Sequence, residues 1–313
     1  MDLRDVFITG TTGYIGEEVA NAFRKASHRV YGLCRNQAKA STLAKNEIIP
    51  VHGDLGQPEA WIDIAKKCPI VIHCGSDYSN YDVDTITTDA ILNGLMSTSS
   101  STPSLFVYTS GINVYKGSPH KPDHRIEEDT AELDEDGSAF LPARIRNEKK
   151  VLSVHERSNG KVHGVVLRPG YVYGRKTRHF VSHWANIHEG KAPQIRGIPD
   201  LIWSEIHIDD LVRAYLLVCT PSVRQNIVGQ AFHLVDESRY TNRSIAETYA
   251  RIAGYEGNIE VVDVSHIPVA KAGQKYLVCS TEKAKLLMGF ECHRRLMLDD
   301  LQVLYDAWKA RLN

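Results

Sequence analysis

The chain has 313 residues, which is enough for one large domain or two modest ones, and its 42% hydrophobic content is ordinary for a globular protein. With 37 basic and 38 acidic residues, the formal net charge of −1 provides no field of one sign that would attract nucleic acid or an anionic membrane surface. No apolar stretch approaches the roughly 20 residues that a membrane-spanning helix needs.

The six cysteines form neither a Cys-x-x-Cys pair nor a cysteine–histidine cluster with the spacing of zinc ligands, so no metal site is expected. Free thiols are typical of proteins in the reducing interior of the cell. No signal peptide is recognisable before the first apolar run at residues 6–8. We therefore expect a cytoplasmic protein whose partner is a small molecule.

The first 170 residues alternate between short apolar runs and longer segments with helical spacing. Strands are predicted at 5–9, 29–34, 48–52, 70–74, 105–109 and 163–168. Helices are predicted between them at 14–26, 38–46, 59–67, 82–96 and 143–157. This alternation is typical of a parallel sheet with helices on both faces. The fold class predicted is α/β, with a Rossmann-like, doubly wound parallel sheet.

The alternation weakens after residue 168, where a smaller C-terminal lobe is predicted. In this part of the chain, helices are expected at 210–219, 244–253, 281–288 and 299–311, and strands at 231–235 and 259–264. Asp209 is predicted to cap the helix at 210–219. We expect a first domain at 1–170 to which 206–235 contribute. Residues 171–313 would mainly form a second lobe that does not fold alone.

A glycine-rich turn follows the first predicted strand and opens the first predicted helix. Gly10 would permit a tight turn, Gly13 would let the backbone approach a pyrophosphate, and Gly16 would let the helix lie close to the strand. The helix N-terminus offers unpaired N–H groups and a positive dipole end to phosphates. The turn therefore predicts a dinucleotide site, although glycine turns also occur as ordinary chain reversals.

The end of the second predicted strand indicates which dinucleotide is bound. An NAD site usually has Asp or Glu there, about 20 residues beyond the turn. This chain instead has Arg35, which can pair with a 2′-phosphate. We therefore predict NADP(H), the alternative being that Arg35 is a solvated residue. Asp54, after the third strand, could accept a hydrogen bond from the adenine amino group or cap the following turn.

Six segments in the same order along the chain resemble the extended short-chain dehydrogenases/reductases, also called the NAD(P)-dependent epimerase/dehydratase family. They are Thr9-Gly10-x-x-Gly13-x-x-Gly16, Gly53-Asp54-Leu55, Val71-Ile72-His73-Cys74-Gly75, Tyr108-Thr109-Ser110-Gly111 with Val114-Tyr115, Leu167-Arg168-Pro169-Gly170-Tyr171-Val172-Tyr173-Gly174, and Ile206-His207-Ile208-Asp209-Asp210. The resemblance implies a substrate-binding second lobe. It also implies a possible homodimer formed through the helices at 82–96 and 143–157.

The resemblance and the glycine turn together define a set of residues expected to contact the cofactor. These are Gly10, Thr12, Gly13, Tyr14, Ile15, Gly16, Arg35, Asp54, Leu55, Cys74, Gly75, Thr109, Arg144, Pro169 and Val172.

The family's catalytic Ser, Tyr and Lys are not matched in this sequence. Alignment on Val114-Tyr115 places Gly111 at the serine position, with Ser110 one residue earlier. Counting back from Glu148 places Phe140 at the tyrosine position and Arg144 at the lysine position. A phenylalanine cannot donate a proton, whereas an arginine can still hold a ribose hydroxyl. The cofactor-holding half of the site is therefore expected to be kept, and the acid–base half to be lost or moved.

Several side chains at the carboxyl ends of predicted strands could replace the missing acid, since ligands bind at that edge of such sheets. The candidates for catalysis are Ser110, Tyr115, Tyr78, Tyr173 and Arg144. Tyr81 also follows the fourth strand. For each of Tyr78, Tyr115 and Tyr173, a place in the pocket wall or the core is favoured over the role of proton donor.

Three functions fit these observations. The first is an NADP(H)-dependent oxidoreductase that acts on a small carbonyl or hydroxyl compound with a non-standard proton donor. The second is a redox-neutral isomerase, cyclase or dehydratase that keeps the cofactor. The third is a non-catalytic NADP(H)-sensing protein. Fold alone does not choose between them.

Overall fold

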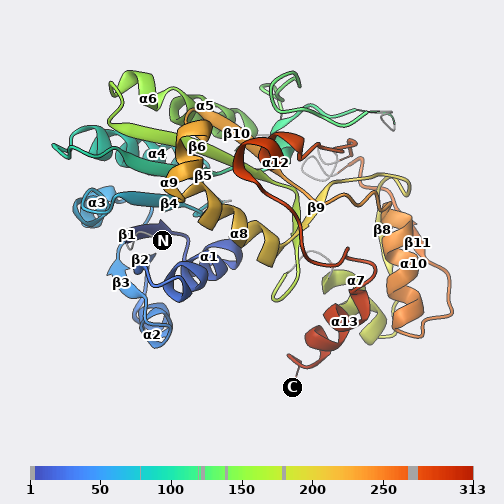
Figure 1. The fold of residues 1–313 in the computed structure, drawn as a ribbon. Coiled ribbons are helices and arrows are strands. Elements are labelled where there is room, and N and C mark those ends of the chain that lie inside the picture. Colours follow the sequence, from blue (N-terminus) through green and yellow to red (C-terminus); the bar gives the residue numbers. More distant parts are fainter. Residues whose placement is uncertain are drawn as a thin grey trace.

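A computed structural model describes residues 4–77, 79–118, 120, 124–137, 140–177, 181–266 and 274–312, except for the side chains of residues 181–183. Its centre is a seven-stranded sheet in which all neighbouring strands run parallel (Figure 1). The strand order is β10 (Gln230–Leu234), β6 (Val162–Pro169), β5 (Ser104–Thr109), β4 (Ile70–His73), β1 (Asp5–Thr9), β2 (Arg29–Cys34) and β3 (Ile49–His52). The predicted α/β, Rossmann-like fold is confirmed.

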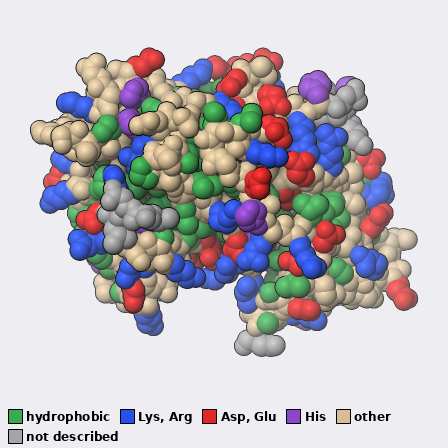
Figure 2. All heavy atoms as spheres, viewed as in Figure 1, with side chains coloured by type: hydrophobic (Ala, Val, Ile, Leu, Met, Phe, Trp, Pro, Cys, Tyr) green, Lys and Arg blue, Asp and Glu red, His purple; other side chains and the backbone are tan. Residues whose placement is uncertain are grey.

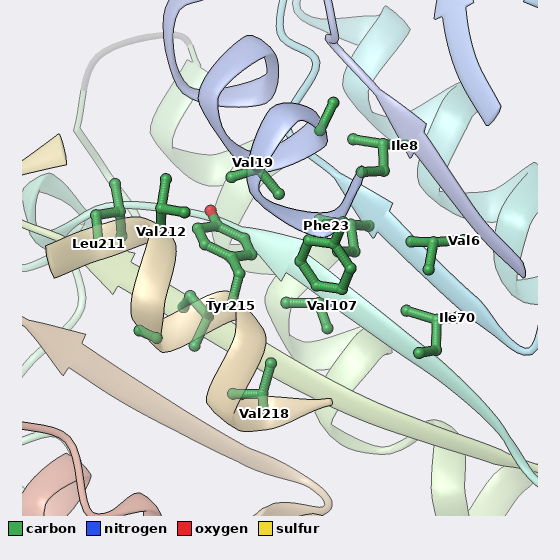
Figure 3. Close-up of a cluster of buried hydrophobic side chains, with 14 of the residues drawn as sticks. Val6, Ile8, Val19, Phe23, Ile70, Val107, Leu211, Val212, Tyr215 and Val218 are labelled. Carbon is green, nitrogen blue, oxygen red and sulfur yellow. The ribbon is translucent and has the colours of Figure 1, made fainter. Parts of the chain in front are cut away.

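Successive strand residues point to opposite faces of the sheet, and helices bury both faces. On one face, Ile8 and Val107 pack with Val19 and Phe23 of α1 and with Tyr215 of α8 (Figure 3). The helices that contribute to this cluster are α1 (Tyr14–Lys25), α2 (Gln37–Lys45), α8 (Ile208–Val218), α9 (Pro221–Ile227) and α12 (Glu282–Met288).

The opposite face is covered by a second set of helices. Phe7 of β1 stacks on Trp61, with ring centroids 5.6 Å apart, and both belong to a cluster with Leu92 and Val151. The elements on this face are the 3₁₀ turn η1 (Pro58–Ala60) and helices α3 (Ile62–Ala65), α4 (Asp82–Met96), α5 (Phe140–Leu152) and α6 (Val154–Arg157). The two clusters make the sheet doubly wound.

The C-terminal residues also form a smaller lobe beside the sheet, on the right of Figure 1. Its core gathers Trp184, Tyr249 and Trp308. The lobe contains α7 (Val181–His188), α10 (Asn242–Ile252) and α13 (Leu301–Lys309), together with two parallel strand pairs, β8 (Gln194–Arg196) with β11 (Glu260–Val262) and β7 (Tyr171–Tyr173) with β9 (Glu205–His207).

The strands of the central sheet lie within one residue of the predicted bounds at each end. Two predicted helices are divided, since 59–67 becomes η1 and α3, and 143–157 becomes α5 and α6. The predicted cap of α8 is wrong. The side chain of His207 caps that helix by accepting from Asp209 N at 3.1 Å, while the Asp209 carboxylate pairs with Arg175 at 2.7 Å.

A buried polar network lies between the sheet and the loops around it. Arg168 of β6 pairs with Glu148 of α5 at 2.6 Å and also donates to the Tyr115 hydroxyl. Burial lowers the pKa of His233 to about 3, so this imidazole is neutral. Its Nδ1 lies 3.0 Å from the Ser280 carbonyl oxygen and its Nε2 lies 2.7 Å from the Tyr115 hydroxyl. Nδ1 therefore donates and Nε2 accepts, and each ring nitrogen has a partner.

Lys, Arg, Asp and Glu side chains are interspersed over the face shown in Figure 2. Among the described residues, no helix is long and apolar enough to cross a membrane. In the same residues, no group of three or more His, Cys, Asp or Glu side chains is arranged to hold a metal ion.

The Arg168–Glu148 pair gives a stability prediction. The Glu148→Gln variant keeps a side chain of similar shape beside the buried Arg168 guanidinium but removes its counter-charge. Removing one partner of a buried ion pair costs about 3–5 kcal/mol. The free energy of unfolding from urea titration should fall by this order. The control is Lys149→Ala, which removes a neighbouring charge whose pair with Glu135 is exposed. It should leave the urea midpoint unchanged, and equal effects of the two variants would contradict the prediction.

Candidate functional site

The glycine turn packs directly against the end of β4. Gly10 has a φ of +72°, and a Cβ atom there would lie 2.6 Å from backbone atoms of Cys74 and Gly75. A Cβ on Gly16 would overlap the Gly10 carbonyl oxygen. Gly13 N donates to that oxygen at 2.9 Å, which closes the turn. Gly10 and Gly16 therefore allow an approach between backbones that no side chain permits.

Helix α1 begins immediately after this turn and presents its first amides without a side-chain cap, because its N-cap is Gly13. Thr12 and Gly13 are exposed at the tip of the turn. The Tyr14 hydroxyl donates to the Gly174 carbonyl at 2.7 Å, and Ile15 packs against the core. The open tip and uncapped amides are the features a pyrophosphate requires.

Two charged residues follow β2 and β3 at the same edge. Arg35 is exposed, and its guanidinium lies 3.8 Å from the Asp54 carboxylate. Asp54 Oδ1 accepts from Gly56 N at 2.9 Å, so it does cap its turn. The Leu55 side chain lies close to Gly75, where an added Cβ would meet it at 2.8 Å. Arg35 is thus accessible to a ligand, with a carboxylate as neighbour.

The side chains of Cys74 and Thr109 form hydrogen bonds with each other and with Tyr215 of α8. Thr109 Oγ1 shares a 2.7 Å hydrogen bond with the Tyr215 hydroxyl and donates to Cys74 Sγ at 3.3 Å. Burial raises the pKa of the Cys74 thiol to about 11. Further along the edge, Pro169 ends β6 beside Leu234, and the Val172 side chain is buried in the core. Cys74 therefore contributes no thiolate nucleophile here.

A buried carboxylate that sequence reasoning missed lies beneath the site. Asp84 of α4 accepts from the Tyr108 hydroxyl at 2.5 Å and from Asn147 Nδ2 at 3.2 Å, and it lies 3.0 Å from His73 Nε2. Burial alone would raise its pKa, but the bond from His73 and the charges of His73 and Arg144 hold that pKa below its ordinary value. Asp84 is thus an ionised group facing Arg144.

A small pocket lies above this carboxylate, between the end of β4 and the first turns of α4 and α5. It is lined by Ser76, Asp77, Tyr81, Asp84, Phe140 and Arg144. Arg144 Nη2 donates to Ser76 Oγ at 3.1 Å, and the guanidinium lies 5.5 Å from the centre of the Phe140 ring. The Tyr81 ring lies 5.7 Å from the same ring. The residues matched to the family's tyrosine and lysine therefore do share one pocket.

The candidate tyrosines outside this pocket are held in the interior. Tyr115 is fully buried, and its hydroxyl bonds Arg168 and His233. Tyr173 donates to Asp236 at 3.3 Å and to the Arg295 carbonyl at 3.1 Å. Burial raises the pKa of both phenols. The structure therefore places neither hydroxyl in the pocket.

The two remaining candidates differ in what the structure says of them. The hydroxyl of Ser110 is buried at the end of β5 and makes no hydrogen bond within the part of the chain that the structure describes. Tyr78 lies outside the described residues.

Comparison with known proteins identifies the family. The model of the NAD dependent epimerase/dehydratase family matches residues 6–229. The chain belongs to this family. An uncharacterised protein of Saccharomyces cerevisiae is 27% identical, with 96% of this chain and 98% of that protein covered. The sterol-4-alpha-carboxylate 3-dehydrogenase of Dictyostelium discoideum is 24% identical over 36% of this chain and 37% of that protein.

Solved structures of this epimerase/dehydratase family share the fold. The dTDP-glucose 4,6-dehydratase of Bacillus anthracis, in complex with NAD, has a TM-score of 0.81 and 18% identity, covering 98% of this chain and 96% of that one. The UDP-glucose 4-epimerase of Thermotoga maritima, with UDP-glucose, has a TM-score of 0.81 and 16% identity, covering 99% and 100%. At these identities the likeness shows the fold alone.

The glycine turn gives a prediction about binding. In Gly16→Ala the new Cβ meets backbone rather than a movable side chain, so the turn must shift, at a cost of roughly 1–3 kcal/mol. The variant should unfold at lower temperature and lose most of its affinity for reduced nicotinamide dinucleotide, measured by cofactor fluorescence. Gly56→Ala is the control, because its Cβ would meet nothing closer than 3.5 Å. Unchanged affinity in Gly16→Ala would remove the turn from the site.

Proposed function

We propose that the protein is an NADP(H)-dependent oxidoreductase that acts on a small carbonyl or hydroxyl compound and does not use the family's phenol as proton donor. The observation that carries the proposal is the pocket in which Arg144 and Phe140 lie together. It combines a cation at the ribose-holding position with a ring that cannot donate a proton.

The fit of a dinucleotide rests on the glycine turn and the helix that follows it. A Cβ would fill the space at Gly10 and Gly16, and the first turn of α1 has uncapped amides for phosphates. Arg144 would hold the nicotinamide ribose, and Ser76 accepts one hydrogen bond from its guanidinium. When bound, a nicotinamide supplies or accepts a hydride. In this proposal the protein contributes binding, orientation and the proton.

The preference for NADP(H) is supported by the charge at the end of β2. Arg35 is exposed and can form a bidentate pair with a 2′-phosphate. Asp54 competes for it at 3.8 Å, while its other oxygen is held by Gly56 N. The Bacillus anthracis dehydratase of similar fold was solved with NAD, so the preference is a property to be measured for this chain.

Substitutions at these two residues test the choice of cofactor. Arg35→Ala should weaken NADPH binding roughly tenfold, the low end of what a charge-assisted bond contributes, because the site is open to solvent. NADH affinity should stay the same. Asp54→Asn keeps an oxygen for Gly56 N and removes the competing charge, so it should bind NADPH more tightly than wild type. Tighter binding of NADH than NADPH by the wild type, in the same titration, would refute the NADP(H) assignment.

The second candidate is a redox-neutral isomerase, cyclase or dehydratase. It is supported by the family to which the chain belongs, whose model describes NAD dependent epimerases and dehydratases. In such a reaction the bound cofactor would be unchanged after each turnover. Net consumption of the cofactor therefore separates the two candidates.

Turnover with a substrate panel tests the proposal directly. The protein is incubated with NADPH and a set of aldehydes, ketones and sugar nucleotides, and nicotinamide absorbance and product mass are followed together. We expect one mole of NADPH to be oxidised for each mole of alcohol formed. Product without loss of NADPH would establish the redox-neutral candidate instead. Tight NADPH binding with no product from any member of the panel would contradict both.

A cytoplasmic location and a homodimer complete the proposal. Ile86 on α4 is 42% exposed, and α4 and α5 lie side by side on one face of the sheet, which supports a dimer contact there. A dimer of this kind would leave the small-molecule site of each subunit open.

A further inference from the structure

The tyrosines near the proposed cofactor site differ in whether their hydroxyls make hydrogen bonds within the protein. Five tyrosines already use their hydroxyls in hydrogen bonds inside the protein: Tyr14, Tyr108, Tyr115, Tyr173 and Tyr215. Tyr81 lines the pocket, is only partly buried, and its hydroxyl makes no hydrogen bond with the residues that the structure describes. Among these six phenols, Tyr81 is the one available to a ligand.

From this placement we infer that Tyr81 is the proton donor of the reaction, an inference that rests on the proposed function. Tyr81 comes from the residue just before α4, whereas the family's phenol comes from the start of α5. Its ring lies beside Phe140, with centroids 5.7 Å apart and planes inclined by 44°. In this proposal the phenol comes from the start of α4 and lines the same pocket as Phe140.

Charged side chains also line the pocket that contains Tyr81. Arg144 lies over the Phe140 ring and supplies a fixed positive charge to the pocket. Asp84 lies beneath, but its carboxylate is engaged by Tyr108, Asn147 and His73. Asp77 also lines the pocket, and its carboxylate accepts from the Ser79 hydroxyl at 2.6 Å. Arg144 is therefore the fixed cation that shares this pocket with Tyr81.

A bound reduced nicotinamide would supply a hydride to the carbonyl carbon of the substrate, and the electron pair of the π bond would move to the oxygen. The Oη–H bond of Tyr81 breaks as a new O–H bond forms on that oxygen, which completes the alcohol. The phenolate remains beside Arg144 and regains a proton from water. In the opposite direction the phenolate accepts the proton from the alcohol.

Paired substitutions test the assignment. Tyr81→Phe removes the hydroxyl and keeps the ring, so kcat should fall roughly 10²–10⁴-fold, the usual worth of a general acid. The Kd for NADPH should not change. Phe140→Tyr, introduced into Tyr81→Phe, returns a phenol to the pocket and should recover part of the lost kcat. Full activity of Tyr81→Phe would overturn the assignment alone, whereas absence of turnover by the wild type would overturn the proposed function and the assignment with it.

A readout without turnover accompanies these variants. Tetranitromethane nitrates accessible phenols, and mass spectrometry locates the modified residues. Tyr81 should be nitrated in the free protein and protected by NADPH, while Tyr255, after α10 in the second lobe, should react equally in both states. Nitration of Tyr81 that NADPH does not reduce would contradict its position beside the cofactor. Loss of activity in Tyr81→Phe without recovery by Phe140→Tyr would attribute the defect to packing and also overturn the assignment.

Discussion

The structure depends on one close backbone approach, where the turn at Gly10 lies against the ends of β1 and β4. An added Cβ would come within 2.6 Å of backbone atoms of Cys74 and Gly75, so this approach is available only to glycine. It fixes how far the N-terminus of α1 reaches over the edge of the sheet. The Tyr14 hydroxyl then ties that first turn to Gly174, where the chain enters the second lobe. The phosphate site and the lobe junction are therefore set by the same contact.

The opposite end of the site is organised by a buried charge. Asp84 accepts hydrogen bonds from within the core, its pKa is held below the ordinary value, and it lines the same pocket as Arg144. A phenylalanine at position 140 keeps the ring over which Arg144 lies, and the hydrogen bonds to Asp84 come from other residues. The cofactor half of the site can therefore persist while the source of the proton changes. Tyr81, on the facing wall, is where the geometry allows that change.

The central sheet could be predicted from the sequence because its strands are buried on both faces and read as short apolar runs. The glycine turn could also be predicted, because the spacing of its glycines follows from the geometry of a short strand–turn–helix segment. The three-residue strands β7, β8 and β9 have no such signal, since their partners are distant in the chain. Likewise, Tyr115 follows a strand end, but its side chain is buried because its hydroxyl forms hydrogen bonds with Arg168 and His233. The buried position of Asp84 could not be predicted, because its hydrogen-bond partners come together only when α4 and α5 pack on the sheet.

The central claim is that one edge of the sheet holds the dinucleotide and brings its nicotinamide to the pocket of Arg144 and Tyr81. A crystal structure of the protein with bound NADPH tests this most directly. We expect the pyrophosphate to lie against the first amides of α1, the 2′-phosphate beside Arg35, and the nicotinamide ring within contact distance of Tyr81. A nicotinamide that lies away from this pocket, or a cofactor that leaves the glycine turn empty, would contradict it.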